Sequence, residues 1–152
     1  MVAAEATSVG AGPVVVGSAL RLTRRQHRRV VRSVEGAELA TGAQFCVYLG
    51  PTGEDPRAHA EAMFHQAGLR TRPAILLLVS PERRHVEIVT SAGIRDRVSD
   101  RICSEAVTAM TGLFTKSDIA GGIVAGIERL QAAVGPASGA PPEEPFPDMI
   151  EE

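Results

Sequence analysis

The sequence predicts a small α/β domain, an α/β/α sandwich in which a mixed sheet carries helices on both faces. Three observations support this fold class. Residues 74–79 form a continuous apolar run, residues 85–90 alternate between apolar and polar, and the polar turn 80–84 joins the two runs. A continuous run is typical of a strand buried on both faces, and alternation is typical of a more exposed antiparallel neighbour. Everything else is expected to pack around this hairpin.

The first half of the chain is expected to contribute a helix, a strand and a second helix. Thr23 is a suitable N-cap for a helix over residues 24–39. Residues 43–49 (AQFCVYL) are predicted to be the first strand of the main sheet. Asp55 can cap a helix that runs from 56 to about 67. This strand, this helix and the strand at 74–79 form a βαβ unit, so their strands should be parallel.

Two helices are expected after the hairpin. Apolar residues recur at intervals of three and four between Ile102 and Leu113, which is the strongest helix signal in the chain. After a break at 115–117, Ser117 or Asp118 can cap a second helix that ends at Gly135-Pro136. The predicted order of elements is therefore α-β-α-β-β-α-α.

Three glycines, Gly121, Gly122 and Gly126, lie inside the last predicted helix. Each costs a helix about 1 kcal/mol relative to alanine, so something should offset them. We expect close packing of this helix on a neighbour, because glycine lets two backbones approach. A phosphate cradle is the alternative, but amides this far inside a helix are already hydrogen-bonded.

The ends of the chain differ in composition from its middle. Residues 1–20 are rich in small residues and are expected to be flexible, with a short edge strand at 13–17. Residues 21–135 are expected to form the single domain. Residues 136–152 are rich in Pro and Glu and are expected to be a disordered acidic tail, in which 146–150 (FPDMI) could serve as a short docking motif.

Charge is distributed unevenly along the 152 residues. The net charge is -2, but five of the 18 acids follow Pro142, where there is no base, so the body of the chain is slightly basic. Aromatic residues make up only 3% and Trp is absent. So few rings and so mild a charge argue against nucleic acid as a partner, because base stacking needs exposed aromatic side chains.

Cysteine content and hydropathy bear on the compartment. Cys46 and Cys103 lie in separate apolar patterns and form neither a disulfide framework nor a zinc motif. No window holds the roughly 20 apolar residues of a membrane helix, and the N-terminus has no basic region before its apolar part. We expect a cytoplasmic protein without a transmembrane segment.

Two sets of side chains are candidates for binding. Asp100 and Asp118 each lie where a loop enters a helix, and if both loops emerge at one end of the sheet they could hold Ca²⁺ or Mg²⁺ weakly, or they could simply cap the helices. A basic helix face could bind phosphates, a partner protein or an anionic surface, or could be merely solvated. This basic face consists of Arg24, Arg25, Arg28, Arg29 and Arg32.

From about Leu22 to Leu130 the chain resembles the TPM domain family, which includes thylakoid lumen proteins and uncharacterised actinobacterial members. The similarity lies in the order and spacing of short pieces. These are the helix start at Leu22-Thr23, Thr41-Gly42-Ala43-Gln44, Phe64 to Gly68, Leu76 to Ser80, Arg83-Arg84 before Val86-Glu87-Ile88, Gly93-Ile94 before Ser99-Asp100, and Leu113-Phe114-x-x-Ser117-Asp118-Ile119-x-x-Gly122-Ile123.

The resemblance implies an α/β/α sandwich with a cleft at one end of the sheet that is often acidic and binds divalent cations. It also implies association with membrane complexes, and acid phosphatase activity has been attributed to some members. This sequence departs from the family pattern at two acidic positions, where it has Arg72 and Arg95. That exchange should weaken a cation site and could turn the cleft toward anions.

We therefore expect a non-enzymatic TPM-like binding or accessory domain, without catalytic residues and with a degenerate cation- or anion-binding cleft. A metal-dependent phosphatase that uses Asp100 and Asp118 is one alternative, although no nucleophile and base pair is visible. A protein that binds a partner, one associated with a membrane for example, through the basic face or the acidic tail is another.

Overall fold

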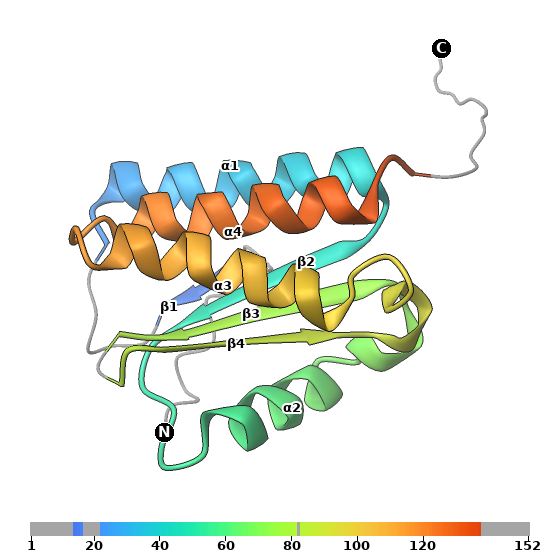
Figure 1. Cartoon of the computed structure of the whole chain (residues 1–152), viewed down its shortest axis with the longest axis horizontal. Helices are drawn as coiled ribbons and strands as arrows, with labels where there is room; N and C mark the ends of the chain where they lie inside the picture. The colour runs from blue at the N-terminus through green and yellow to red at the C-terminus, as the bar shows by residue number, and fades with distance from the viewer. Residues whose placement is uncertain (1–13, 17–21, 82, 138–152) are drawn as a thin grey trace.

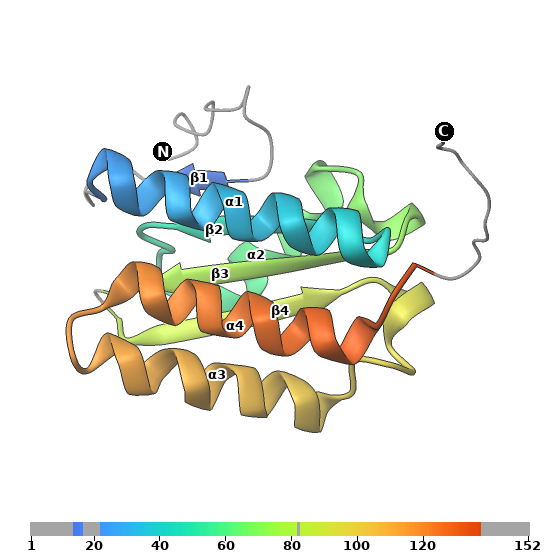
Figure 2. The same ribbon diagram turned by 90° about the horizontal axis from the view of Figure 1, so that it is seen from above.

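The computed structural model describes residues 14–16, 22–81 and 83–137, and it has three layers. A sheet lies in the middle, helix α2 covers one face, and helices α1, α3 and α4 cover the other (Figure 1). Seen from above, those three helices lie side by side, with α4 between α1 and α3 (Figure 2). The expected α/β/α sandwich is confirmed.

The helices and strands follow the predicted order. They are β1 (Val14–Val16), α1 (Arg24–Thr41), β2 (Gln44–Leu49), α2 (Pro56–Gln66), the short 3₁₀ helix η2 (Leu69–Thr71), β3 (Ala74–Ser80), β4 (His85–Thr90), the short 3₁₀ helix η3 (Ala92–Ile94), α3 (Asp100–Phe114) and α4 (Ile119–Val134). From α1 onward the main elements run α-β-α-β-β-α-α, as expected. Strand β1 lies within the segment 13–17. Our expectations about 1–12 and 138–152 concern residues that lie outside the described part.

The described strands form one sheet in the order β1-β2-β3-β4. Strands β1, β2 and β3 are parallel, and β4 is antiparallel to β3, with Leu77 opposite Ile88. Every residue of β3 is buried, whereas the first half of β4 alternates between buried and partly exposed side chains. The continuous and alternating runs of the sequence thus became a central strand and an outer strand.

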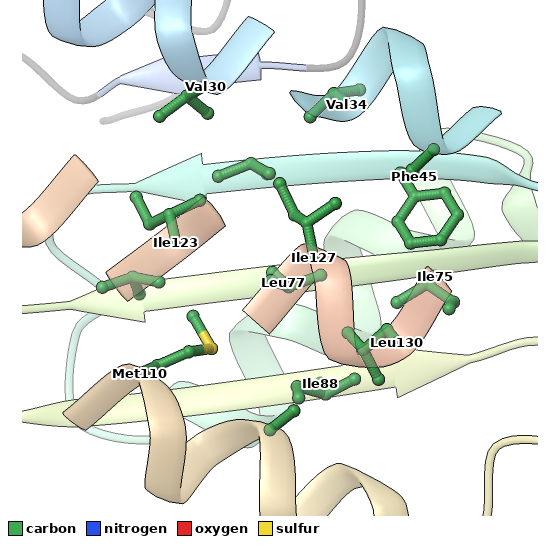
Figure 3. Close-up of a cluster of buried hydrophobic side chains, with 14 of the residues drawn as sticks. Val30, Val34, Phe45, Ile75, Leu77, Ile88, Met110, Ile123, Ile127 and Leu130 are labelled. Atoms are coloured by element: carbon green, nitrogen blue, oxygen red, sulfur yellow. The ribbon is translucent and has the colours of Figure 1, made fainter. Parts of the chain in front are cut away.

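The core lies on both faces of the sheet and is almost entirely aliphatic. On the face of α1, α3 and α4, one cluster of buried side chains contains Val30, Leu77, Ile127 and Leu130, together with Phe45 (Figure 3). On the opposite face a smaller cluster, which contains Tyr48 and Phe64, packs beneath α2. No helix in the described part is both long and apolar enough to cross a membrane.

The predicted N-caps determine where the helices begin. Thr23 and Gln26 form a reciprocal capping box at α1, in which Thr23 Oγ1 accepts from Gln26 N–H at 3.0 Å. Asp55 caps α2 through Ala58 N–H, at 3.0 Å. At α4 the cap is Asp118, while Ser117 adopts a left-handed conformation with φ of 64°. Of the two caps that the sequence allowed, the structure therefore uses Asp118.

Candidate functional site

Asp100 and Asp118 do not come together. Asp100 is the first residue of α3, and Asp118 follows the end of α3 and caps α4, with its Oδ1 accepting from Gly121 N–H at 2.9 Å. A helix of 15 residues is about 22 Å long, so the two carboxylates lie at opposite ends of α3. The expectation that their loops share one end of the sheet was wrong, because α3 itself separates the loops.

The expected role of Asp100 as a helix cap also needs correction. Ser99 is the N-cap of α3, and its side chain accepts from Ile102 N–H at 3.3 Å. Asp100 lies in the first turn, where its charge favours the positive end of the helix dipole. In the described residues, no group of three or more His, Cys, Asp or Glu side chains is placed to hold a metal ion.

Arg72 and Arg95 lie at the same end of the sheet but in different hollows. Arg72 Nη1 donates to Gln44 Oε1 at 3.0 Å, beside Gly42 and Ala43. Arg95 Nη2 donates to the backbone oxygen of Thr90 at 3.1 Å, at the end of β4. The resemblance had led us to expect that both arginines line one cleft. The structure places them in two separate hollows.

A groove of about 770 Å³ runs along the outer side of β4, between this strand and α3. Its lining includes Val86, Ile88 and Thr90 from β4, Arg57 from α2, Arg95 and Val98 from the segment before α3, and Asp100, Cys103, Ser104 and Val107 from α3. The α3 residues are spaced by three and four, so one face of that helix forms a wall. Asp100 and Arg95, predicted separately, thus line the same groove.

Two arginines from different elements bind the outer edge of β4. Arg57 Nη1 donates to the backbone oxygen of Ile88 at 3.0 Å, and Arg95 donates to that of Thr90, two residues further along. Because alternate residues of a strand direct their backbone groups to the same side, both carbonyls lie on the edge that faces away from β3. Arg57 was not predicted as a site residue, because no motif in the sequence surrounds it.

Arg57 is also the centre of an ion-pair network on the α2 side of the groove. Its guanidinium pairs with Glu61 at 2.8 Å and with Glu87 at 3.2 Å, and Glu87 pairs in turn with His85. Partial burial by itself would lower the pKa of Arg57, but the hydrogen bonds from these two carboxylates outweigh it and raise that pKa above its ordinary value. Arg57 is therefore a permanently charged, well-anchored group.

A second depression, which we call the arginine hollow, lies at the end of β4 next to α2. It has a volume of about 460 Å³, and its charged or titratable lining residues are Arg57, Glu61, His65, Arg70 and Arg95. Glu61 is the one acid among these lining residues and already pairs with Arg57. Arg70 contacts His65 Nδ1 at 2.9 Å. The lining of the arginine hollow thus carries an excess of positive charge.

The basic face of α1 is solvent-exposed in the structure. Arg24, Arg25, Arg28, Arg29 and Arg32 are all exposed, while Val30 and Val34 on the other side of the helix are fully buried. None of the five has a carboxylate within 4 Å among the described residues. The acidic segment after Pro142, which could compete for this face, lies outside the described part.

Residues 16–131 match a family model described as "Domain of unknown function (DUF5130)". The chain belongs to this family. Two curated relatives are uncharacterized proteins of Mycobacterium tuberculosis, Rv2468c of strain H37Rv and MT2543 of strain CDC 1551, each 28% identical over 97 residues. The match covers 64% of this DUF5130 chain and spans 58% of the length of each relative.

Solved structures share the fold of this DUF5130 domain. The BA42 protein of the psychrophilic bacterium Bizionia argentinensis has a TM-score of 0.69 and 26% identity, covering 77% of this chain and 86% of BA42. The N-terminal domain of a P. gingivalis protein has a TM-score of 0.69 at 19% identity, with 80% of each chain covered. The N-terminal domain of cg2496 from Corynebacterium glutamicum has 0.66 at 15%, covering 86% of this chain and 85% of that domain.

Proposed function

We propose that this DUF5130 domain is a TPM-like, non-enzymatic binding module that takes small anions such as phosphate in the arginine hollow. The TPM-like part of the proposal is supported by the order of elements from α1 to α4, together with the short motifs from Leu22 to Ile123. The anion-binding part is supported by the charge of the arginine hollow's lining.

One observation carries the proposal: the arginine hollow has three guanidinium groups and a single carboxylate in its lining. Glu61 neutralises Arg57, so Arg70 and Arg95 are left without a carboxylate partner among the described residues. A guanidinium presents several N–H donors in a fixed plane that matches phosphate and carboxylate oxygens. Two such groups in the lining of one depression provide the donors that an anion site needs.

The same observations argue against a metal-dependent phosphatase and against a cation-binding cleft. A metal-dependent phosphatase that used Asp100 and Asp118 together would need these carboxylates close to one another, and α3 holds them apart. Weak binding of Ca²⁺ or Mg²⁺ by either carboxylate alone would have few protein ligands, whereas Ca²⁺ takes six to eight oxygens. A partner bound on the basic face of α1 is compatible with the anion site and independent of it.

An amide NMR titration of the full chain with inorganic phosphate, and separately with Ca²⁺ and Mg²⁺, tests the proposal. We expect phosphate to cause saturable shifts at Arg70, Ala92 and Arg95. These shifts should be lost in Arg95→Gln and retained in Arg32→Gln, a matched variant on the basic face. Phosphate shifts confined to 24–32, or unchanged by Arg95→Gln, would overturn the proposal, and saturable Ca²⁺ shifts at Asp100 or Asp118 would favour a cation site instead.

A further inference from the structure

The outer edge of β4 has no neighbouring strand in the described part of the chain. The side on which each residue directs its backbone groups follows from the contacts. Ser91 N–H donates to Ala74 O, at the start of β3, so odd-numbered residues here face β3. The carbonyls of Ile88 and Thr90 accept from arginines on the other side. The backbone groups of Val86, Ile88 and Thr90 therefore form an open edge.

The open edge lies at the floor of the groove between β4 and α3. Val86 and Ile88 give this floor apolar side chains, and Cys103 and Val107 add apolar surface on the wall formed by α3. A groove between an exposed sheet edge and a helix is a recurrent site for strand addition, in which main-chain hydrogen bonds provide affinity and alternate side chains provide specificity. The groove thus has the shape and the donor and acceptor pattern for one extended segment.

We propose that residues 143–152 of this chain (EEPFPDMIEE) add to β4 as a fifth strand and occupy the groove. The segment lies outside the described residues, and its amino-acid sequence supports pairing with a strand edge. Pro145 and Pro147 are two residues apart, so in a strand both missing N–H groups fall on the same edge. The other edge keeps the N–H groups of Glu144, Phe146 and Asp148. Such a segment can pair through one of its two edges only, which suits an edge strand of a sheet.

Arg57 and Arg95 line the groove together with Glu87 and Asp100, so its apolar side chains and the unpaired Arg95 are what an acidic and apolar segment can contact. The segment has no base and carries Glu143, Glu144 and Asp148 beside the apolar Phe146 and Ile150. When its N–H groups bond to Ile88 O and Thr90 O, Arg95, which has no carboxylate within 4 Å among the described residues, becomes free to pair with the carboxylates of the segment. Arg57 gives up Ile88 O and stays paired with Glu61 and Glu87. Before that exchange the arginines shield the edge, as charged side chains do on many natural edge strands.

The point where the described chain ends makes the contact reachable. Arg97 Nη1 donates to Val134 O at 3.1 Å, which ties the end of α4 to the segment that follows η3. Arg97 is two residues from Arg95 at the end of the groove. From Ala137, the last described residue, nine residues lead to Phe146, which is a reach of about 30 Å when extended. Ala137 N–H donates to Ala40 O at 3.0 Å, so the chain leaves beside the end of α1 and has to pass the end of α4 to arrive at β4. An extended reach of about 30 Å allows this within one molecule.

Strand addition to β4 depends on the open backbone edge. It does not require that the arginine hollow binds phosphate. Arg57 and Arg95 line both the groove and the arginine hollow, but strand addition is detected at the amides of β4 and phosphate binding at those around Arg70 and Arg95. A phosphate titration without response, with protected β4 amides, would leave the strand in place and remove only the proposed anion site.

The experiment is amide hydrogen exchange by NMR on the full chain, read at Ile88 and Thr90. Asp148→Pro removes an N–H from the edge that should face β4, whereas Met149→Pro removes one from the opposite edge. Asp148→Asn keeps the N–H and removes only the charge. We expect exchange at Ile88 and Thr90 to be slow in the parent and in Met149→Pro, and at least ten-fold faster in Asp148→Pro.

Two results would overturn the proposal. One is equal exchange at Ile88 and Thr90 in the parent, Asp148→Pro and Met149→Pro, which would show that no segment pairs with the open edge in this register. The other is protection that grows with protein concentration together with sedimentation as a dimer, which would assign the edge to a second copy of the chain. Asp148→Asn should show intermediate exchange, since it removes the charge that would pair with Arg95 and keeps the backbone bonds.

Discussion

Gly126 of α4 lies directly against Met110 of α3. A Cβ atom built on Gly126 would stand 2.5 Å from Met110 Sδ and 2.7 Å from Met110 Cγ, and Met110 is fully buried. One turn earlier, a Cβ on Gly122 would stand 2.4 Å from Phe114. The glycines that weaken α4 on propensity grounds therefore allow the two helices to approach, and the expectation of close packing is confirmed.

Replacing Gly126 by Ala should destabilise the domain by about 1–3 kcal/mol, because the added methyl group overpacks a filled interface. The measurement is the free energy of unfolding from urea titrations. Gly36→Ala is the matched control, since Gly36 is exposed inside α1 and a Cβ there would meet nothing within 4 Å. The control should gain about 0.5–1 kcal/mol from helix propensity. An equal gain in Gly126→Ala would contradict the packing role.

Local patterns in the sequence were enough to predict the fold. The apolar run at 74–79 was predicted to be a buried strand, and Thr23 and Asp55 were identified as caps from their spacing to the helices that follow. For the last helix the sequence left two caps open, and the structure uses Asp118. The separation of Asp100 and Asp118 could also have been predicted from the sequence. A residue that begins one helix and a residue that follows its end cannot converge, whatever the tertiary packing.

The groove could not be predicted in the same way. It depends on how far α3 stands from β4 and on the side chains of Arg57 and Arg95, which come from segments about 40 residues apart. No periodicity or motif marks an arginine that will donate to a backbone carbonyl of a distant strand. This information is held only in tertiary geometry, so only the structure could bring these two residues to one edge.

Two buried serines make a matched pair for a second prediction. Ser80 Oγ is completely buried and has no hydrogen-bond partner among the residues that the structure describes, whereas buried Ser91 Oγ accepts from Ala74 N–H at 3.0 Å. Removing a hydroxyl without a partner relieves a desolvation penalty of about 1–3 kcal/mol, and removing an engaged one leaves a backbone N–H unsatisfied.

We therefore expect Ser80→Ala to stabilise the domain and Ser91→Ala to destabilise it, each by about 1 kcal/mol or more in the free energy of unfolding. Chemical denaturation of both variants beside the parent checks this. A loss of stability in Ser80→Ala would mean that the hydroxyl binds an internal water, which the substitution would strand.

Cys46 should be a poor nucleophile. Burial, together with the nearby negative charge of Glu38, raises the pKa of its thiol from 9.0 to about 11. Reactivity follows the thiolate fraction, so at pH 8 alkylation should be about 100-fold slower than for a thiol with the ordinary value. The rate should keep rising about ten-fold per pH unit up to pH 10, because deprotonation is incomplete throughout that range.

The measurement of Cys46 reactivity is the iodoacetamide alkylation rate of Cys103→Ser against pH, followed by mass spectrometry. Burial raises the pKa of Cys103 as well, so its alkylation would be hard to distinguish from that of Cys46. Removing Cys103 leaves Cys46 as the one thiol in the chain. The same variant in urea supplies the unfolded reference. A native rate that levels off near pH 9 would show that the thiol is not desolvated as the structure indicates.

The ion pair between Glu105 of α3 and Arg129 of α4 should make stability depend on pH. The hydrogen bond from Arg129 lowers the pKa of Glu105 below its ordinary value of 4.5. A carboxylate with a lowered folded-state pKa stabilises the native state above its unfolded pKa, and that contribution is lost as pH falls through the folded value. The loss should therefore begin near pH 4.5 and continue below it.

Thermal unfolding at pH 7, 5, 4 and 3 measures this dependence in the parent and in Glu105→Gln. The glutamine cannot be protonated, so between pH 5 and pH 3 the midpoint of the variant should fall less than that of the parent. The difference should be small, because the pair is partly exposed and solvent screens it. In 0.5 M salt the gap should narrow further. Parallel curves at low salt would show that the pair makes no pH-dependent contribution to holding α3 against α4.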